Sequence, residues 1–148
     1  MKNYRLGFDV WALALFLILL LPTVLWTLSP PLRDVLRRES DTPTVDIIGS
    51  VFQVLTVATL CFVQRKGWPR ENPLWAYAAT IVCVQLYYAG WVLYYVGITT
   101  PVVMLLMTLP PCMAFIFFAI ARRNMLAAIF AAGFTVCHLI FALENFIF

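Results

Sequence analysis

Polar and acidic side chains stand inside long apolar stretches of this sequence, among them Asp46, Gln53, Gln85, His138 and Glu144. A polar group that faces lipid hydrocarbon without a hydrogen-bond partner costs several kcal/mol. Gln53, Gln85 and His138 lie near the centres of their stretches. We therefore predict that these three side chains converge inside the protein near the bilayer midplane, where amide and imidazole groups could bind a small ligand.

Prolines stand near the centres of the two remaining stretches, at Pro22 and at Pro110-Pro111. Proline has no N–H, so the carbonyl four residues before it loses its helical donor. The carbonyls affected are those of Ile18, Leu106 and Met107. Two interpretations remain open. The polar groups could form a ligand site like the broken-helix sites of transporters, or glutamine amides could bond to the freed carbonyls and join helices.

Two acids and two aromatic residues complete the candidate ligand-binding set. Carboxylates inside a membrane are functional candidates, which applies to Asp46 and Glu144. Asp46 could instead stabilise the first turn of its helix, and Glu144 could reach interfacial water. Tyr88 and Trp91 lie too deep for an interfacial aromatic belt and are candidates to line a pocket.

The sequence favours neither a metal, a cofactor nor catalysis. Its cysteines all fall within apolar stretches, where we expect them to pack as small hydrophobic residues, and no CxxC or HxxxH spacing is present. With a single histidine, a haem would lack a second histidine ligand. His138 and Glu144 stand about 120° apart on a helix, so they form no acid–base pair. We predict a protein that is not an enzyme.

Composition defines the elements that must position these residues. Of 148 residues, 64% are apolar and 11% are charged, which excludes a soluble enzyme, a disordered chain and a nucleic-acid-binding module. A membrane-spanning helix needs about 20 apolar residues. Five stretches meet this length, and we predict a single all-α domain, a five-helix transmembrane bundle. The predicted helices are 10–28, 44–63, 74–96, 101–121 and 125–148.

Basic residues predict the orientation of the bundle. Of the ten Lys and Arg residues, seven precede the first stretch or lie in the second and fourth connections, against three in the first loop. The positive-inside rule then places the N-terminus in the cytoplasm and the C-terminus outside, in the cytoplasmic membrane. The first stretch is longer than a signal-peptide core and lacks a cleavage site, so we expect it to be retained.

The outer loop, residues 29–43, has two interpretations. Leu32, Val35 and Leu36 follow helical spacing, with arginines on the other side, which is typical of a short helix on the membrane surface. The alternative is a structured loop packed over the bundle. On the following helix, Asp46, Gly49, Ser50 and Gln53 share one face, with Thr42 as its expected N-cap.

Several motifs resemble a group of small multi-pass membrane proteins of bacteria to which no activity is assigned. They are Leu21-Pro22-Thr23-Val24-Leu25-Trp26, the run from Asp34 to Pro43, Asp46, Gln53, Pro110-Pro111-Cys112 and Cys137-His138-Leu139-Ile140. The resemblance implies a bundle and no function. The Trp26-to-Pro31 segment also loosely resembles the loop of tryptophan-rich sensory (translocator) proteins.

Three functions are compatible with these features. The first is binding, with or without transport, of a small or lipid-like ligand at a polar site near mid-membrane. The second is an accessory or protective role in another membrane protein complex, and the third is an intramembrane enzyme. The expected partners are the bilayer, such a ligand, and a second copy of the chain or another membrane protein; nucleic acid is not expected.

Overall fold

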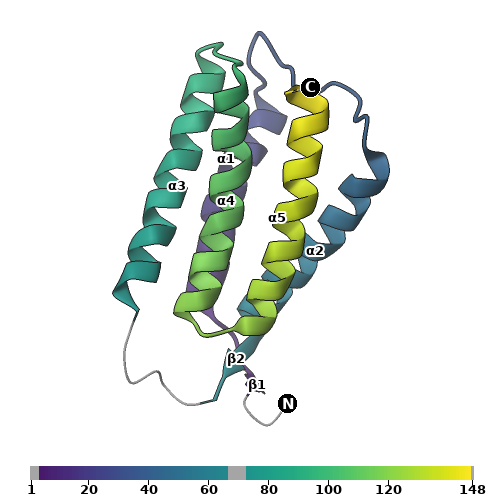
Figure 1. Ribbon diagram of the computed structural model, residues 1–148. Coiled ribbons are helices and arrows are strands. Elements are labelled where there is room, and N and C mark those ends of the chain that lie inside the picture. Colours follow the sequence, from purple (N-terminus) through teal and green to yellow (C-terminus); the bar gives the residue numbers. More distant parts are fainter. Residues whose placement is uncertain (1–3, 67–72, 148) are drawn as a thin grey trace.

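The computed structural model describes residues 4–66 and 73–147, and five long helices make up most of it. They run up and down the long axis of one bundle (Figure 1). Each is long and apolar enough to cross a membrane, so the predicted five-helix bundle is confirmed and the chain is a multi-pass integral membrane protein. The helices are α1 (Val10–Leu28), α2 (Pro43–Phe62), α3 (Leu74–Tyr95), α4 (Pro101–Ala121) and α5 (Met125–Phe146).

The predicted helix limits agree with the observed ones to within two residues. Pro43 opens α2 in the first turn, where its missing N–H needs no helical partner, and Thr42 is the N-cap residue as predicted. The sequence did not predict two short strands, β1 (Tyr4–Leu6) and β2 (Val63–Arg65), which pair antiparallel. Residues 1–3, 67–72 and 148, with the basic residues Lys2 and Arg70 counted above, lie outside the described part.

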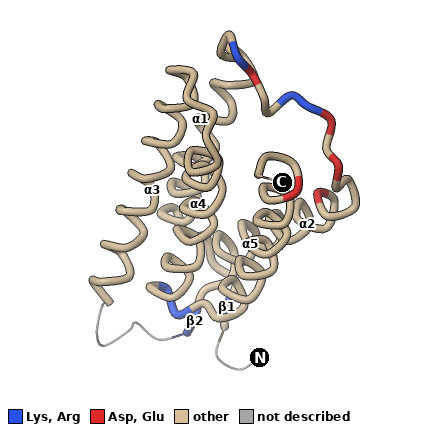
Figure 2. Tube along the Cα trace, turned by 45° about the horizontal axis from the view of Figure 1, so that its top comes forward, with Lys and Arg blue, Asp and Glu red and all other residues tan. Residues whose placement is uncertain are grey.

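Charged residues gather at the two ends of the bundle (Figure 2). The "strand end" carries β1, β2 and the turn at Arg122–Asn124, whereas the "loop end" carries residues 29–42, the turn at 96–100 and the C-terminus (Figure 1). The flanks between these ends are mostly apolar, as a hydrocarbon environment requires.

Residues 29–42 form an irregular loop, so the surface-helix interpretation is wrong and the packed-loop alternative is correct. Asp34 fixes the loop: its carboxylate accepts from Trp26 Nε1 at 3.0 Å and from the Tyr94 hydroxyl at 2.7 Å. Leu36 packs partly buried against the core, while Leu32 is fully exposed. In a helix Asp34 and Leu36 would point about 200° apart. They could not then face the bundle together, as they do in the irregular loop.

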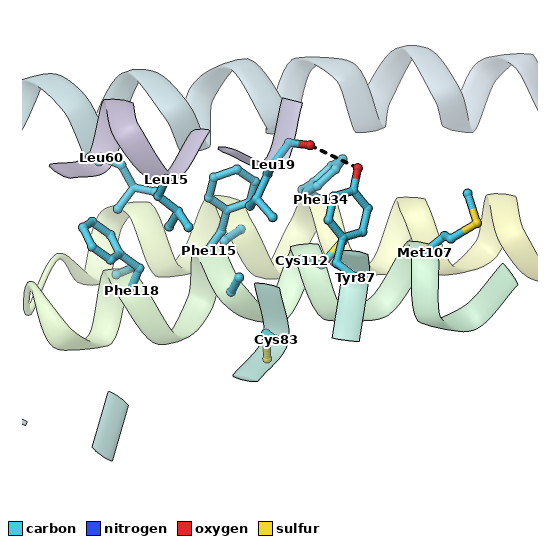
Figure 3. Packing of buried hydrophobic residues seen from close by; sticks show 14 of the residues in the cluster. Leu15, Leu19, Leu60, Cys83, Tyr87, Met107, Cys112, Phe115, Phe118 and Phe134 are labelled. Atoms are coloured by element: carbon cyan, nitrogen blue, oxygen red, sulfur yellow. Dashed lines mark hydrogen bonds between the residues drawn. The ribbon is translucent and has the colours of Figure 1, made fainter. Parts of the chain in front are cut away.

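α4 is the central helix, with most of its membrane-spanning window buried by its neighbours. Its bulky side chains Phe115 and Phe118 meet Leu15 and Leu60 in the core (Figure 3). Two glycines allow close approach of helices. A Cβ at Gly90 would lie 3.0 Å from Met107 of α4, and one at Gly133 would lie 2.8 Å from the Phe52 ring of α2. These glycines therefore set the α3–α4 and α2–α5 spacing.

The strand end is closed by Asp9. Its side chain caps α1 by accepting from Trp11 N and Ala12 N, and it pairs with Arg122 Nη2 at 2.7 Å. The pair joins α1 to the end of α4 and is largely buried, with the two side chains 9% and 27% exposed. Gly7 N and Asp9 N also bond to the carbonyls of Phe62 and Cys61, which tie the start of α1 to the end of α2.

Replacing Asp9 should test this closure. Asp9→Ala removes the cap and leaves a largely buried guanidinium without its carboxylate, so the free energy of unfolding should fall by about 3 kcal/mol. Asp9→Asn keeps a capping oxygen and should cost less than Asp9→Ala. Unfolding in mixed detergent micelles measures both variants, and equal losses for the two would contradict the importance of the cap.

Candidate functional site

A cavity of about 510 Å³ lies among the helices, and all five contribute to its wall. This is within the range of small-molecule sites, which are mostly apolar with a few convergent polar groups. Its walls are rich in aromatic rings, among them Phe16, Trp26, Phe115 and Phe141. Leu36 of the 29–42 loop also contributes, so the cavity reaches the loop end of the bundle.

The predicted polar face of α2 lines this cavity. Asp46, Gly49, Ser50 and Gln53 all contribute to the wall, as their shared helical face requires. Gly49 brings α2 against α5, because a Cβ there would meet that of Cys137 at 3.2 Å. Among the described residues the Gln53 amide has no hydrogen-bond partner, so it is free to bind a ligand rather than to join helices.

His138 faces the same cavity from α5. Its ring stacks between two phenylalanines of that helix, with centroids 5.0 Å from Phe134 and 6.0 Å from Phe141. Like Gln53, it has no hydrogen-bond partner within the described part of the chain. The two side chains thus line one cavity, and neither has a hydrogen-bond partner among the described residues.

Trp91 adds a third unpaired polar group. The residue is 7% exposed and lines the cavity, and its Nε1 is buried with no hydrogen-bond partner. Its ring is fixed edge-on against Tyr87 and Tyr94 at centroid distances of 6.3 and 5.8 Å. An unmade hydrogen bond of a buried donor costs about 1–3 kcal/mol, which an acceptor on a bound ligand would recover.

The charge on the described part of the cavity wall is negative. Among the described residues that line it, Asp46 is the only acid and none is a lysine or arginine. Within the described residues the Asp46 carboxylate accepts only one weak bond, from the Thr42 hydroxyl at 3.5 Å. An anionic ligand would therefore meet a carboxylate and no basic side chain, whereas a cation would meet a carboxylate and aromatic faces, which attract cations.

Tyrosines of α3 use their hydroxyls to hold α1. Tyr88 donates to the carbonyl of Ile18 at 2.7 Å, the one that Pro22 deprives of its helical donor. Tyr87 donates to the neighbouring carbonyl of Leu19 at 3.0 Å (Figure 3). One of the two interpretations of the sequence paired such freed carbonyls with glutamine amides; at Ile18 the Tyr88 hydroxyl is the donor instead.

Three predicted site residues stand elsewhere. Gln85 is exposed on the outer side of α3 and does not line the cavity, so its predicted convergence with Gln53 and His138 is wrong. The Tyr88 hydroxyl donates to the Ile18 carbonyl, and Tyr88 does not line the cavity. Glu144 is exposed and does not line it either. The physical reason is the rotation of α3. Its small residues pack against α4, which turns Trp91 inward and Gln85 outward.

Two asparagines lock the ends of the bundle. Asn124 caps α5 and donates to the carbonyls of Thr59 and Val63, which fixes α5 to α2 at the strand end. At the loop end Asn145 accepts from Asp41 N at 2.7 Å and donates to the Thr42 hydroxyl. Asn124 follows a turn between two apolar stretches, a common N-cap signal, whereas nothing local marks Asn145.

Comparisons with protein-family models, with curated proteins and with solved structures find no match to this chain.

Removing the Tyr88 hydroxyl should measure the value of its bond to α1. Tyr88→Phe leaves the Ile18 carbonyl without a donor, and we expect the free energy of unfolding to fall by about 0.6–2 kcal/mol. Tyr77→Phe is the matched control, because the Tyr77 hydroxyl has no hydrogen bond among the described residues. Equal stability of both variants in detergent unfolding would show that the bond contributes nothing.

Proposed function

We propose that this membrane protein binds a small amphipathic cation in the cavity among its five helices. The single observation that carries the proposal is the set of unpaired polar groups on an aromatic wall: Gln53, His138 and the buried Trp91 Nε1. The alternative of interhelical bonding needs partners for these groups. In the described residues Gln53 and His138 have none, which favours a ligand site.

The acidic residue on the cavity wall favours a cationic ligand over an anionic one. A carboxylate without a basic neighbour on the cavity wall disfavours free fatty acids and phosphate groups, which would repel Asp46. Aromatic rings and one acid are the combination that recognises ammonium-type cations. The ligand would then place an apolar body between the rings, a cationic or donor group near Asp46, and an acceptor near Trp91.

Transport of this ligand would require an additional step. Secondary transporters expose one midway site alternately to the two sides of the membrane. Here Asp9 and Arg122 hold α1 against α4 at the strand end. Opening the cavity to that side by separating α1 from α4 would break the pair, whereas simple binding would leave it intact.

A pair of size-matched hydrophobic ions tests the binding proposal. Purified protein in lipid nanodiscs should bind tetraphenylphosphonium saturably, measured by equilibrium dialysis, while tetraphenylborate should not compete for the site. Asp46→Asn should weaken binding of the cation at least about tenfold, equivalent to ~1.4 kcal/mol, because the only carboxylate of the cavity is lost.

Glu144→Gln is the matched control for that experiment. It removes another carboxylate of the same region, but one that is exposed and does not line the cavity. Cation affinity should stay unchanged in this variant. Equal weakening by both substitutions, competition by the anion, or no saturable binding of the cation would each contradict the proposal.

We also propose that the strand end faces the cytoplasm of a cell whose cytoplasmic membrane holds the protein. The support is the excess of Lys and Arg in the segments at that end. A cysteine introduced at Ser40 should react with a membrane-impermeant maleimide in intact cells, and one introduced at Lys66 should react only after lysis. Labelling of Lys66→Cys in intact cells would show that the strand end faces outward and would contradict the proposed orientation.

A further inference from the structure

Helix α3 carries two stripes of residues with the same spacing on opposite faces. The buried stripe consists of Ala76, Thr80, Cys83, Tyr87, Gly90 and Tyr94. The exposed stripe, here named the outer stripe, consists of Ala78, Val82, Gln85, Ala89, Val92 and Val96. Both alternate steps of four and three residues, the spacing with which one helix packs along another in a left-handed pair. They are offset by two residues, or about 200° around the helix.

The buried stripe shows how this helix packs. Along it α3 lies against α4, and at Gly90 the approach is so close that a Cβ would lie 3.1 Å from the Leu106 Cβ. The outer stripe has the same spacing but consists of alanines, valines and one glutamine, and it faces away from the bundle. α3 lies on the flank of the molecule (Figure 1). Val82 and Val92 are 52% and 62% exposed.

Gln85 stands at the centre of α3 and of the outer stripe. Its side chain is exposed, and no hydrogen bond to it is found in the described part of the chain. Surrounded by lipid, its amide would have neither donors nor acceptors to satisfy it, which costs free energy. A glutamine at this depth is therefore satisfied only if another polar group reaches it from a neighbouring helix.

We propose that the outer stripe is the interface with a second copy of this chain. Two copies inserted with the same orientation present Gln85 at the same depth, so a parallel pair of α3 helices places the two amides opposite each other. A side-chain amide both donates and accepts, so each copy satisfies the other around a twofold axis. The chain itself thus supplies the complementary group, at the required depth and on the required face.

The size and charge of the residues on α3 also suit a second copy of this chain as the partner. Ala89 is the next residue of the stripe after Gln85, and Ala78 lies two steps before it; small side chains let helix backbones approach closely in membranes. α3 contains no charged residue, so two copies of it do not repel each other. The inference is independent of the ligand site, because no residue of the outer stripe lines the cavity.

Self-association in lipid tests the proposal. Copies labelled with donor and acceptor fluorophores and mixed in liposomes should show concentration-dependent energy transfer. Gln85→Leu should raise the dissociation constant about tenfold, and Gln85→Asn, which keeps the amide, should raise it less. Because Gln85 has no partner inside the bundle, detergent unfolding should show that the leucine variant is no less stable than the wild type.

A second substitution separates packing from polarity. Ala89→Leu adds bulk at the centre of the outer stripe and should also weaken association, whereas Ala132→Leu makes the same change at an exposed site of α5 and should not. A monomeric wild type, or a dimer that is insensitive to both Gln85→Leu and Ala89→Leu, would overturn the proposal. So would an equal effect of Ala132→Leu.

Discussion

The hydroxyl groups of α3 that donate to carbonyls of α1 are the interactions on which the rest of the structure depends. Pro22 leaves the Ile18 carbonyl without its helical donor, and Tyr88 supplies one. Tyr87 and Tyr95 donate in the same way to Leu19 and Ser29. These bonds hold α1 beside α3 along its second half, while backbone bonds from Gly7 and Asp9 hold its start beside α2.

The cavity follows from this division. Among the described residues, hydrogen bonds hold α1 to α2 at the strand end and to α3 further along. Near the loop end no such bond joins α1 to α2, and the cavity lies there. The 29–42 loop contributes Leu36 to the wall of that space at the loop end, and Asp34 fixes the loop by binding Trp26, Tyr94 and Arg37 at once. The result is a cavity in which some wall residues, such as Trp26 and Tyr87, hold the loop and helices by hydrogen bonds, while Gln53, His138 and Trp91 Nε1 have no partner among the described residues.

The polar residues of the chain thus fall into two groups with different physical roles. Those at the ends, such as Asp9, Asn124 and Asn145, are buried and bonded to several partners from distant parts of the sequence. Those in the middle, Gln53, His138 and Trp91, contact the cavity and have no partner in the described residues. Stability comes from the first group and from apolar packing, which leaves the second group available for binding.

Properties of single helices could be predicted from the sequence. The five spans follow from apolar length, and the shared face of Asp46, Gly49, Ser50 and Gln53 follows from helical geometry alone, whatever surrounds it. The rotation of α3 could not be predicted, because both its faces carry the same spacing and both carry polar groups. Only packing against α4 at Gly90 decides that Trp91 turns inward and Gln85 outward. The Asp9–Arg122 pair joins residues 113 positions apart, and the cavity is bounded by five helices. Both exist only once the helices have assembled, because no local pattern encodes a contact between distant segments.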